Sequence, residues 1–218
     1  SNVFNLTGKI LNFIKTFIIP ITIVGAIFSL FISPKDYIQG DSARIMYIHV
    51  PSAWISLMSF ALISIFAIIN FIFKIKNLSL IYKSLAPIGL TFNFIAIFTG
   101  SLWGQPTWGT WWAWDARLAS MLLLMIFFIF FILSYKFIKD PIKSSKICTI
   151  ISVLGLINLV IIKYSVSWWA TLHQPSSINL IGETTVHSSM LIPLLIMLFV
   201  FLLYTALIFL MKYRIETI

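Results

Sequence analysis

Residues 190–211 read MLIPLLIMLFVFLLYTALIFLM, a run of 22 residues without a charged side chain. A helix needs about 20 mainly apolar residues to cross the roughly 30 Å hydrocarbon core of a bilayer. This run therefore predicts a membrane-spanning helix. Five further apolar runs precede it, at about residues 16–32, 52–73, 85–102, 118–133 and 147–166. The sequence predicts an all-α integral membrane protein, a single membrane domain over residues 1–218 built as a bundle of six spanning helices.

The composition supports the same fold class. The chain is 60% hydrophobic and only 10% charged, whereas soluble domains are about 25% charged. A soluble globular protein is thereby excluded. With one cysteine, Cys148, the sequence has no disulfide framework, no cysteine-based metal site and no C-x-x-C-H motif for covalent heme capture.

The first apolar run follows Lys9 and Lys15, as the hydrophobic core of a secretory signal peptide would. It has no small-residue cleavage pattern near its end, where residues 28–32 read FSLFI, and its apolar stretch is longer than such a core. We expect it to be a retained anchor.

The basic residues are distributed unevenly between the two ends of the spans. Six spans place both termini on one side, and that side carries eleven of the fifteen Lys and Arg residues: Lys9, Lys15, Lys74, Lys76, Lys83, Lys136, Lys139, Lys143, Lys146, Lys212 and Arg214. Cytoplasmic loops are enriched in Lys and Arg, so we expect cytoplasmic termini and outer loops at about residues 33–51, 103–117 and 167–189. The net charge of +9 then reflects the orientation of the chain in the lipid membrane, and no nucleic-acid partner is expected.

Tryptophan is concentrated on the outer side. All eight residues lie there: Trp54, Trp103, Trp108, Trp111, Trp112, Trp114, Trp168 and Trp169. An aromatic belt, the ordinary explanation, places Trp at both interfaces. The one-sided distribution favours a surface for a large, planar, apolar ligand, on which indole rings can stack.

Five of these tryptophans belong to the outer loop 103–117. Gly104, Pro106 and Gly109 predict an irregular early part. A helical turn from Trp108 would place Trp108, Trp111, Trp112 and Asp115 on one face.

Two of the three histidines flank this loop in matching positions. His49 lies in a predicted short interfacial helix that Asp41 caps and Pro51 ends, and His173 follows Trp168 and Trp169 just before Pro175. Imidazoles from two separate segments suit the axial positions of a planar metal macrocycle. The alternative for each is an interfacial side chain bonded to a backbone carbonyl. For His187, which has no aromatic neighbours, we expect a structural role.

The charged residues near the loops leave two interpretations open. Arg44, Arg117 and Lys35 can pair with carboxylates of a ligand. Alternatively, Asp36, Gln39 and Asp41 hold the loops together, and Asp115 pairs with Arg117.

Residues 108–118, WGTWWAWDARL, resemble the tryptophan-rich WWD signature of heme-handling proteins in cytochrome c maturation. Together with residues 44–51 (RIMYIHVP), residues 172–175 (LHQP), the length and six spans, they resemble the CcmC (heme exporter protein C) family. The resemblance implies non-covalent heme b on the periplasmic or intermembrane-space face, with His49 and His173 as axial iron ligands. It implies a surrounding site of Trp103, Trp108, Trp111, Trp112, Trp114, Asp115, Arg117, Arg44, Trp168 and Trp169.

The same resemblance implies partners and a location. The heme chaperone CcmE would receive the heme, and the small membrane subunit CcmD and the ATP-driven transporter subunits CcmA and CcmB would act in the same system. The membrane would be the bacterial inner membrane or the mitochondrial inner membrane.

Three other roles are weighed against heme presentation. A permease that exports heme or another hydrophobic solute needs polar groups along its spans, which offer mainly Asn70, Asn93 and Asn158. A bundle that only docks partners leaves the two histidines unexplained. An enzymatic role in attaching heme to the chaperone stays open. No side-chain nucleophile or general base in the sequence requires such a role.

Overall fold

The computed structural model describes residues 2–75, 77–174 and 186–217, with side chains from residue 4 onward. Its elements are α1 (Asn2–Ile27) with the π-helical η1 (Phe28–Ile32), the 3-10 helix η2 (Asp41–Ile45), α2 (Met46–Phe73), α3 (Leu78–Trp108), α4 (Ala116–Phe137), α5 (Pro141–Trp168) and α6 (Ser188–Glu216). Six of these helical segments are long and apolar enough to cross a membrane. The predicted all-α, six-span fold class is confirmed, and each helix extends beyond the predicted apolar run.

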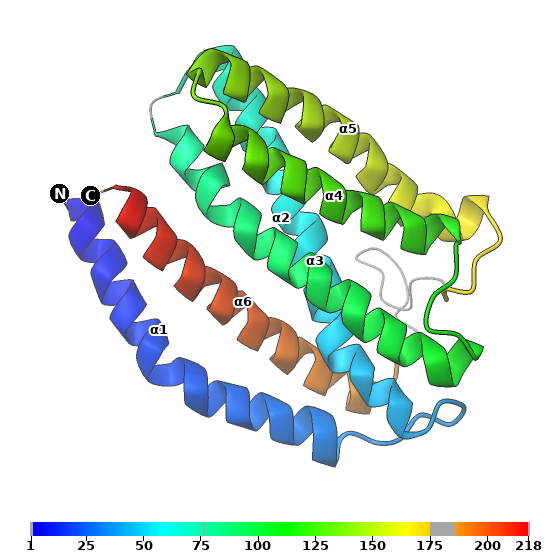
Figure 1. Ribbon diagram of the computed structural model, residues 1–218. Helices are drawn as coiled ribbons and strands as arrows, with labels where there is room; N and C mark the ends of the chain where they lie inside the picture. Colours follow the sequence, from blue (N-terminus) through cyan, green and yellow to red (C-terminus); the bar gives the residue numbers. More distant parts are fainter. Residues whose placement is uncertain (1, 76, 175–185, 218) are drawn as a thin grey trace.

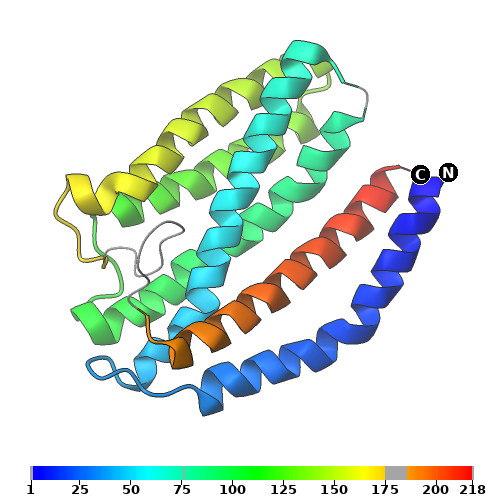
Figure 2. The same cartoon turned by 180° about the vertical axis from the view of Figure 1, so that it is seen from behind.

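The helices form a group of four, α2–α5, with the pair α1 and α6 alongside (Figures 1 and 2). The start of α1 lies against the end of α6. There the Arg214 guanidinium donates to the Phe4 carbonyl and, at 3.0 Å, to Thr7 Oγ1. The segment 33–45, the end of α3 and the end of α5 lie together at the opposite end of the bundle (Figure 1). Segments far apart in the sequence are thereby brought to one place.

Close contacts between glycines and aromatic rings set the spacing of the four-helix group. A Cβ atom at Gly155 of α5 would lie 2.1 Å from Cε1 of Phe60, and one at Gly89 of α3 would lie 2.5 Å from Cε1 of Phe128. Both rings are fully buried and pack edge to face, with centroids 4.9 Å apart. Small residues let helix backbones approach closely in membranes, and here they admit rings that join α2, α3, α4 and α5.

The tryptophan-rich segment begins its irregular course later than predicted. α3 continues through Gly104 and Pro106 and ends at Trp108. A proline near the end of a helix forgoes only one backbone bond, whereas Gly109 adopts a left-handed φ of 74° and its N–H bonds to the Gln105 carbonyl at 3.0 Å, as helix-ending glycines do. The irregular segment is therefore 109–115. Because these residues are not helical, the prediction of one helical face from Trp108 to Asp115 is wrong.

The prediction of a separate interfacial helix that ends at Pro51 is also wrong. Pro51 lies inside α2, which begins at Met46 directly after η2, so His49 belongs to the spanning helix itself. Asp41 makes no capping bond at the start of η2. Its carboxylate pairs with Lys35 and Arg44 instead.

Candidate functional site

His49 is held on α2 by the neighbouring helix α3. Its Nδ1 lies 2.9 Å from the Ala96 carbonyl and 3.3 Å from Thr99 Oγ1, and its ring meets that of Trp103 edge on, with centroids 5.8 Å apart. A carbonyl only accepts, so Nδ1 carries the proton in the bond to Ala96. Nε2 then keeps its lone pair, the arrangement that prepares a histidine to bind a metal.

Gly100 supplies the space for this ring. A Cβ atom at position 100 would lie 2.9 Å from Cε1 of His49 and 3.3 Å from its Nδ1. With Ala96 and Thr99 it forms a small-residue face of α3 opposite His49. Sequence reasoning missed these three residues; their helical spacing in a predicted span was the available signal.

His173 lies in the irregular segment after α5. Its ring centroid is 6.3 Å from that of Trp108, and its Nδ1 lies 2.8 Å from the Gln174 carbonyl, which again leaves the Nε2 lone pair available. Burial, followed by the positive charge of Arg117, lowers the pKa of His173 below its ordinary value. The imidazole therefore stays neutral, the form that ligates a metal, to a lower pH than an ordinary histidine.

Asp115 connects the start of α4 to the His173 segment. Its Oδ1 accepts from the backbone N–H groups of Arg117 and Leu118, at 3.0 and 2.8 Å, and caps α4. Its Oδ2 accepts from the Thr171 hydroxyl at 2.6 Å and from the Leu172 N–H at 3.2 Å. The carboxylate makes no ion pair with the Arg117 side chain among the described residues. Thr171 is a further residue that sequence reasoning missed.

Two tryptophans near the end of α3 each contact one of the two histidines. Trp103 and Trp108 are five residues apart, about 7.5 Å along the axis of α3 and about 140° around it. Trp103 contacts the ring of His49, and Trp108 contacts the ring of His173. The Trp103 indole is fixed by its Nε1–H, which donates to Gln39 Oε1 at 2.9 Å. The structure thus pairs the predicted residues His49 with Trp103 and His173 with Trp108, and adds Gln39 behind Trp103.

The other tryptophans are arranged more loosely. Trp111 and Trp114 are 57% and 80% exposed, and Trp112 meets Trp114 edge to face. The indole N–H of Trp112 is buried and has no hydrogen-bond partner among the described residues.

Trp168 and Trp169, at the end of α5, are about half exposed. Trp168 stacks on Tyr164, with ring centroids 5.2 Å apart. Neither indole has an aromatic contact with His49 or His173 in the described structure. Trp54 packs with Tyr47, Leu194 and Met197.

The charged residues of the segment 33–45 hold that segment together. Asp41 pairs with Lys35 at 2.6 Å and with Arg44 at 2.8 Å, and the Arg44 guanidinium also donates to the Ser33 carbonyl at 3.1 Å. Asp36 accepts from the N–H groups of Ile38 and Gln39. In this segment Asp36 and Asp41 thus hold the loop together, which is the second of the two interpretations given above. Arg117 has no ion-pair partner among the described residues.

His187 has a local structural role, as expected. It precedes α6, and its Nδ1 accepts from the Ser189 N–H at 3.3 Å and caps the helix. Pro175, which belongs to the sequence motif around His173, and Lys76 lie outside the described residues.

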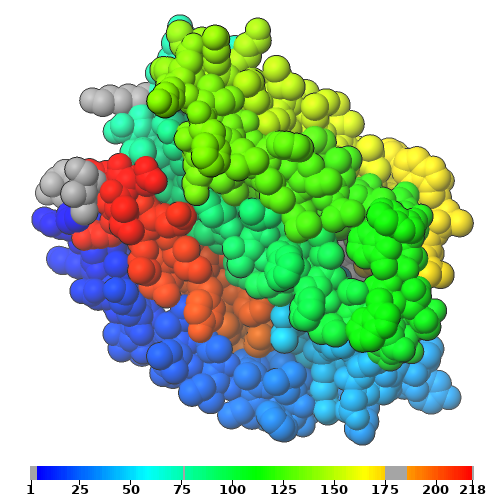
Figure 3. Space-filling model, viewed as in Figure 1, coloured from blue at the N-terminus to red at the C-terminus, as the bar shows by residue number. Residues whose placement is uncertain are grey.

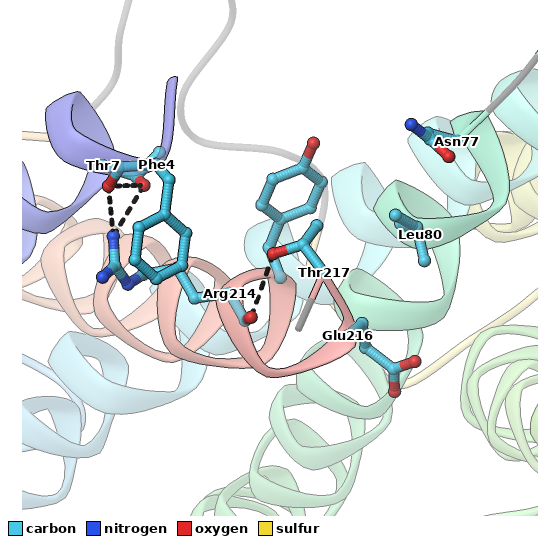
Figure 4. Close-up of a pocket in the computed structure, with 8 residues that line it drawn as sticks. Phe4, Thr7, Asn77, Leu80, Arg214, Glu216 and Thr217 are labelled. Carbon is cyan, nitrogen blue, oxygen red and sulfur yellow. Dashed lines mark hydrogen bonds between the residues drawn. The ribbon is translucent and has the colours of Figure 1, made fainter. Parts of the chain in front are cut away.

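The cavities show why size alone does not identify the site. The larger of two cavities, about 650 Å³, lies where the start of α1 meets the end of α6, near the start of α3 (Figure 4), and Phe4, Asn77, Tyr213 and Glu216 are among its lining residues. The smaller one, about 230 Å³, lies at the end of the bundle that carries His49 and His173, called the histidine end below. Gln39, Trp108 and Leu172 are among its lining residues. Figure 3 shows this end as an exposed corner formed by the green end of α3, the light-blue segment near 40 and the yellow end of α5. Neither His49 nor His173 is among the residues that line the smaller cavity, and its volume is below the usual 300–1,000 Å³ of a ligand pocket.

Comparison with known proteins gives consistent matches over most of the chain. The family model described as heme exporter protein C (CcmC) matches residues 1–218. Heme exporter protein C of Bradyrhizobium diazoefficiens is 37% identical over 196 residues, which cover 90% of this chain and 74% of the relative. A putative cytochrome c biosynthesis ccmC-like mitochondrial protein of Marchantia polymorpha is 39% identical over 194 residues, 89% of this chain and 82% of the relative. Heme exporter protein C of Escherichia coli strain K12 is 37% identical over 191 residues, 88% and 77% of the two chains. With six apolar helices of spanning length and these matches, the chain is a multi-pass membrane protein that belongs to the CcmC, or heme exporter protein C, family.

Proposed function

We propose that this protein binds heme b non-covalently at the histidine end of the bundle and presents it to the heme chaperone CcmE. Membership of the family supports a role in heme handling during cytochrome c maturation. One observation carries the finer proposal. Two histidines from different elements each have a ring against a tryptophan near the end of α3. Each also makes the backbone-carbonyl bond that the structural alternative expects, through Nδ1, which leaves Nε2 for a metal.

The donor set of this end suits heme. His49 and His173 would supply neutral Nε2 atoms to the iron, because axial imidazole is a common ligand of heme iron. The exposed indoles of Trp111 and Trp114 would cover apolar porphyrin surface. The Arg117 guanidinium, which has no ion-pair partner among the described residues, suits a propionate. Bound heme would supply the iron porphyrin that the maturation system attaches to its acceptor; this chain's residues bind and orient it.

The membrane orientation and the partners belong to the same proposal. The basic end with both termini would face the cytoplasm by the positive-inside rule, and the histidine end would face the periplasm or the intermembrane space. The indoles of Trp168 and Trp169, which are about half exposed and precede the His173 segment, would form an aromatic contact surface for the chaperone. CcmD, CcmA and CcmB would act with the protein in the bacterial or mitochondrial inner membrane.

The test is the visible spectrum of the protein purified in detergent from heme-replete cells. We expect a Soret band in the wild type, and its loss or a shift in His49→Ala and His173→Ala, because each removes one axial ligand. His187→Ala is the matched control, since His187 caps α6 and makes no contact with either site histidine in the described structure. A wild-type protein without a Soret band contradicts the proposal; a band that neither substitution alters contradicts the axial assignment.

A further inference from the structure

The carboxylate of Asp115 is shared between two separate segments. One oxygen caps α4 through the N–H groups of Arg117 and Leu118, and the other accepts from the Thr171 hydroxyl and the Leu172 N–H. The Thr171 hydroxyl oxygen in turn accepts from the backbone N–H of His173 at 3.0 Å. A continuous chain of hydrogen bonds therefore leads from the first turn of α4 to the backbone of His173.

This chain holds a segment that has no regular structure. α5 ends at Trp168, with the Trp169 N–H bonded to the Ser165 carbonyl, and residues 170–174 are neither helix nor strand. A carboxylate acceptor forms stronger hydrogen bonds than a neutral one. The described hydrogen bonds that tie this segment to another element are the two bonds to Asp115.

We propose that Asp115 and Thr171 form a clamp that positions His173 beside Trp108. They are positioning residues for the ligand. The proposal rests on the proposed function for the role of His173, whereas the clamp is a property of the polypeptide and can be tested without heme. Ligand-orienting neighbours of this kind typically change metal affinity 10- to 100-fold.

Four variants separate the clamp from the helix cap. Asp115→Asn keeps a good capping residue but places an amide donor opposite the Thr171 hydroxyl and the Leu172 N–H. Thr171→Val removes the hydroxyl and leaves the α4 cap intact, and Thr171→Ser restores the hydroxyl. Asp140→Asn is the matched control, because Asp140 caps α5 through Ile142 and Lys143 at the other end of the bundle.

The first measurement is hydrogen exchange of the Leu172 and His173 amides in heme-free protein, since these two N–H groups are the ones the clamp binds. Loss of one hydrogen bond predicts about 3- to 10-fold faster exchange in Asp115→Asn and Thr171→Val. Thr171→Ser and Asp140→Asn are expected to exchange like the wild type. Equal exchange in all five proteins overturns the clamp.

The second measurement is the ferric heme spectrum, with heme affinity, in the same proteins. We expect Thr171→Val and Asp115→Asn to lose part of the low-spin, two-imidazole signature and to bind heme about 10-fold more weakly, with added imidazole restoring the low-spin signature. A wild-type spectrum in Thr171→Val overturns the positioning role. If His173→Ala also leaves the spectrum unchanged, the axial assignment fails separately, while the exchange data still decide the clamp.

Discussion

His49 and His173 carry the same imidazole but are held by two different kinds of structure. His49 is part of α2, with its ring between Trp103 and the small-residue face of α3. His173 is in the segment after α5, which the Thr171 hydroxyl and the Leu172 backbone N–H bond to the Asp115 carboxylate; the His173 N–H bonds to that hydroxyl. A residue on a packed helix moves only with that helix, whereas a loop residue can adjust locally. We therefore expect the site to tolerate change around His173 far better than around His49.

The largest difference is expected from single-residue insertions. One alanine between His49 and Val50 would rotate His49 by about 100° relative to the rest of α2 and remove it from Ala96. One glycine between Trp169 and Ala170 only lengthens the irregular segment. We expect heme affinity to fall at least about 100-fold in the first variant and less than about 10-fold in the second, measured by heme titration of proteins with wild-type elution and circular dichroism. Equal losses would remove the contrast between the two ligands.

Gly100→Ala tests the space that His49 occupies. The added methyl group would lie 2.9 Å from Cε1 of His49, so the ring must move although alanine favours the helix by about 1 kcal/mol. We expect heme affinity to fall about 10- to 100-fold without loss of thermal stability. Phe94→Ala, on an exposed face of α3, is the control for a change on the same helix, and unaltered binding in Gly100→Ala would show that the ring has room.

Gln39→Leu tests the support behind Trp103. It removes the acceptor for the indole N–H, a bond worth about 0.5–1.5 kcal/mol, and we expect heme affinity to fall about 2- to 10-fold. A double-mutant cycle with Trp103→Phe separates the bond from other effects. Strictly additive effects of the two substitutions would mean that Gln39 does not act through Trp103.

Thr99→Val is expected to have the smallest effect. The Thr99 hydroxyl lies 3.3 Å from His49 Nδ1, farther than the Ala96 carbonyl, and it already donates to the Ile95 carbonyl at 2.6 Å. Heme affinity should change less than about 2-fold in the same titration. A larger loss would identify Thr99, instead of the Ala96 carbonyl, as the group that holds the imidazole.

The number of helices was predictable because membrane insertion depends on apolar length, which the runs of sequence display directly. The helix ends were less predictable. Pro51 and Pro106 both lie inside helices, since a proline removes one donor without ending a helix that its neighbours hold. Gly109 ends α3 through its left-handed backbone, and the sequence does not distinguish it from Gly104.

The candidate site divides along similar lines. The chemistry of their side chains is enough to make His49, His173, Trp103 and Trp108 candidates, and their part in binding heme stays a prediction. Ala96 acts through its carbonyl and Gly100 through the absence of a side chain, so their residue types do not indicate these roles. The clamp escaped prediction because Asp115 and Thr171 become neighbours only when α4 and α5 pack side by side.

The fit of Gly100 around the His49 ring also has an evolutionary consequence. The two residues belong to different helices, and each restricts what the other position can hold. Relatives that keep histidine at the position of His49 are expected to keep glycine at the position of Gly100. A lineage that replaced this histidine with a small residue would be free to vary the glycine, so the two positions should change together in an alignment of the family.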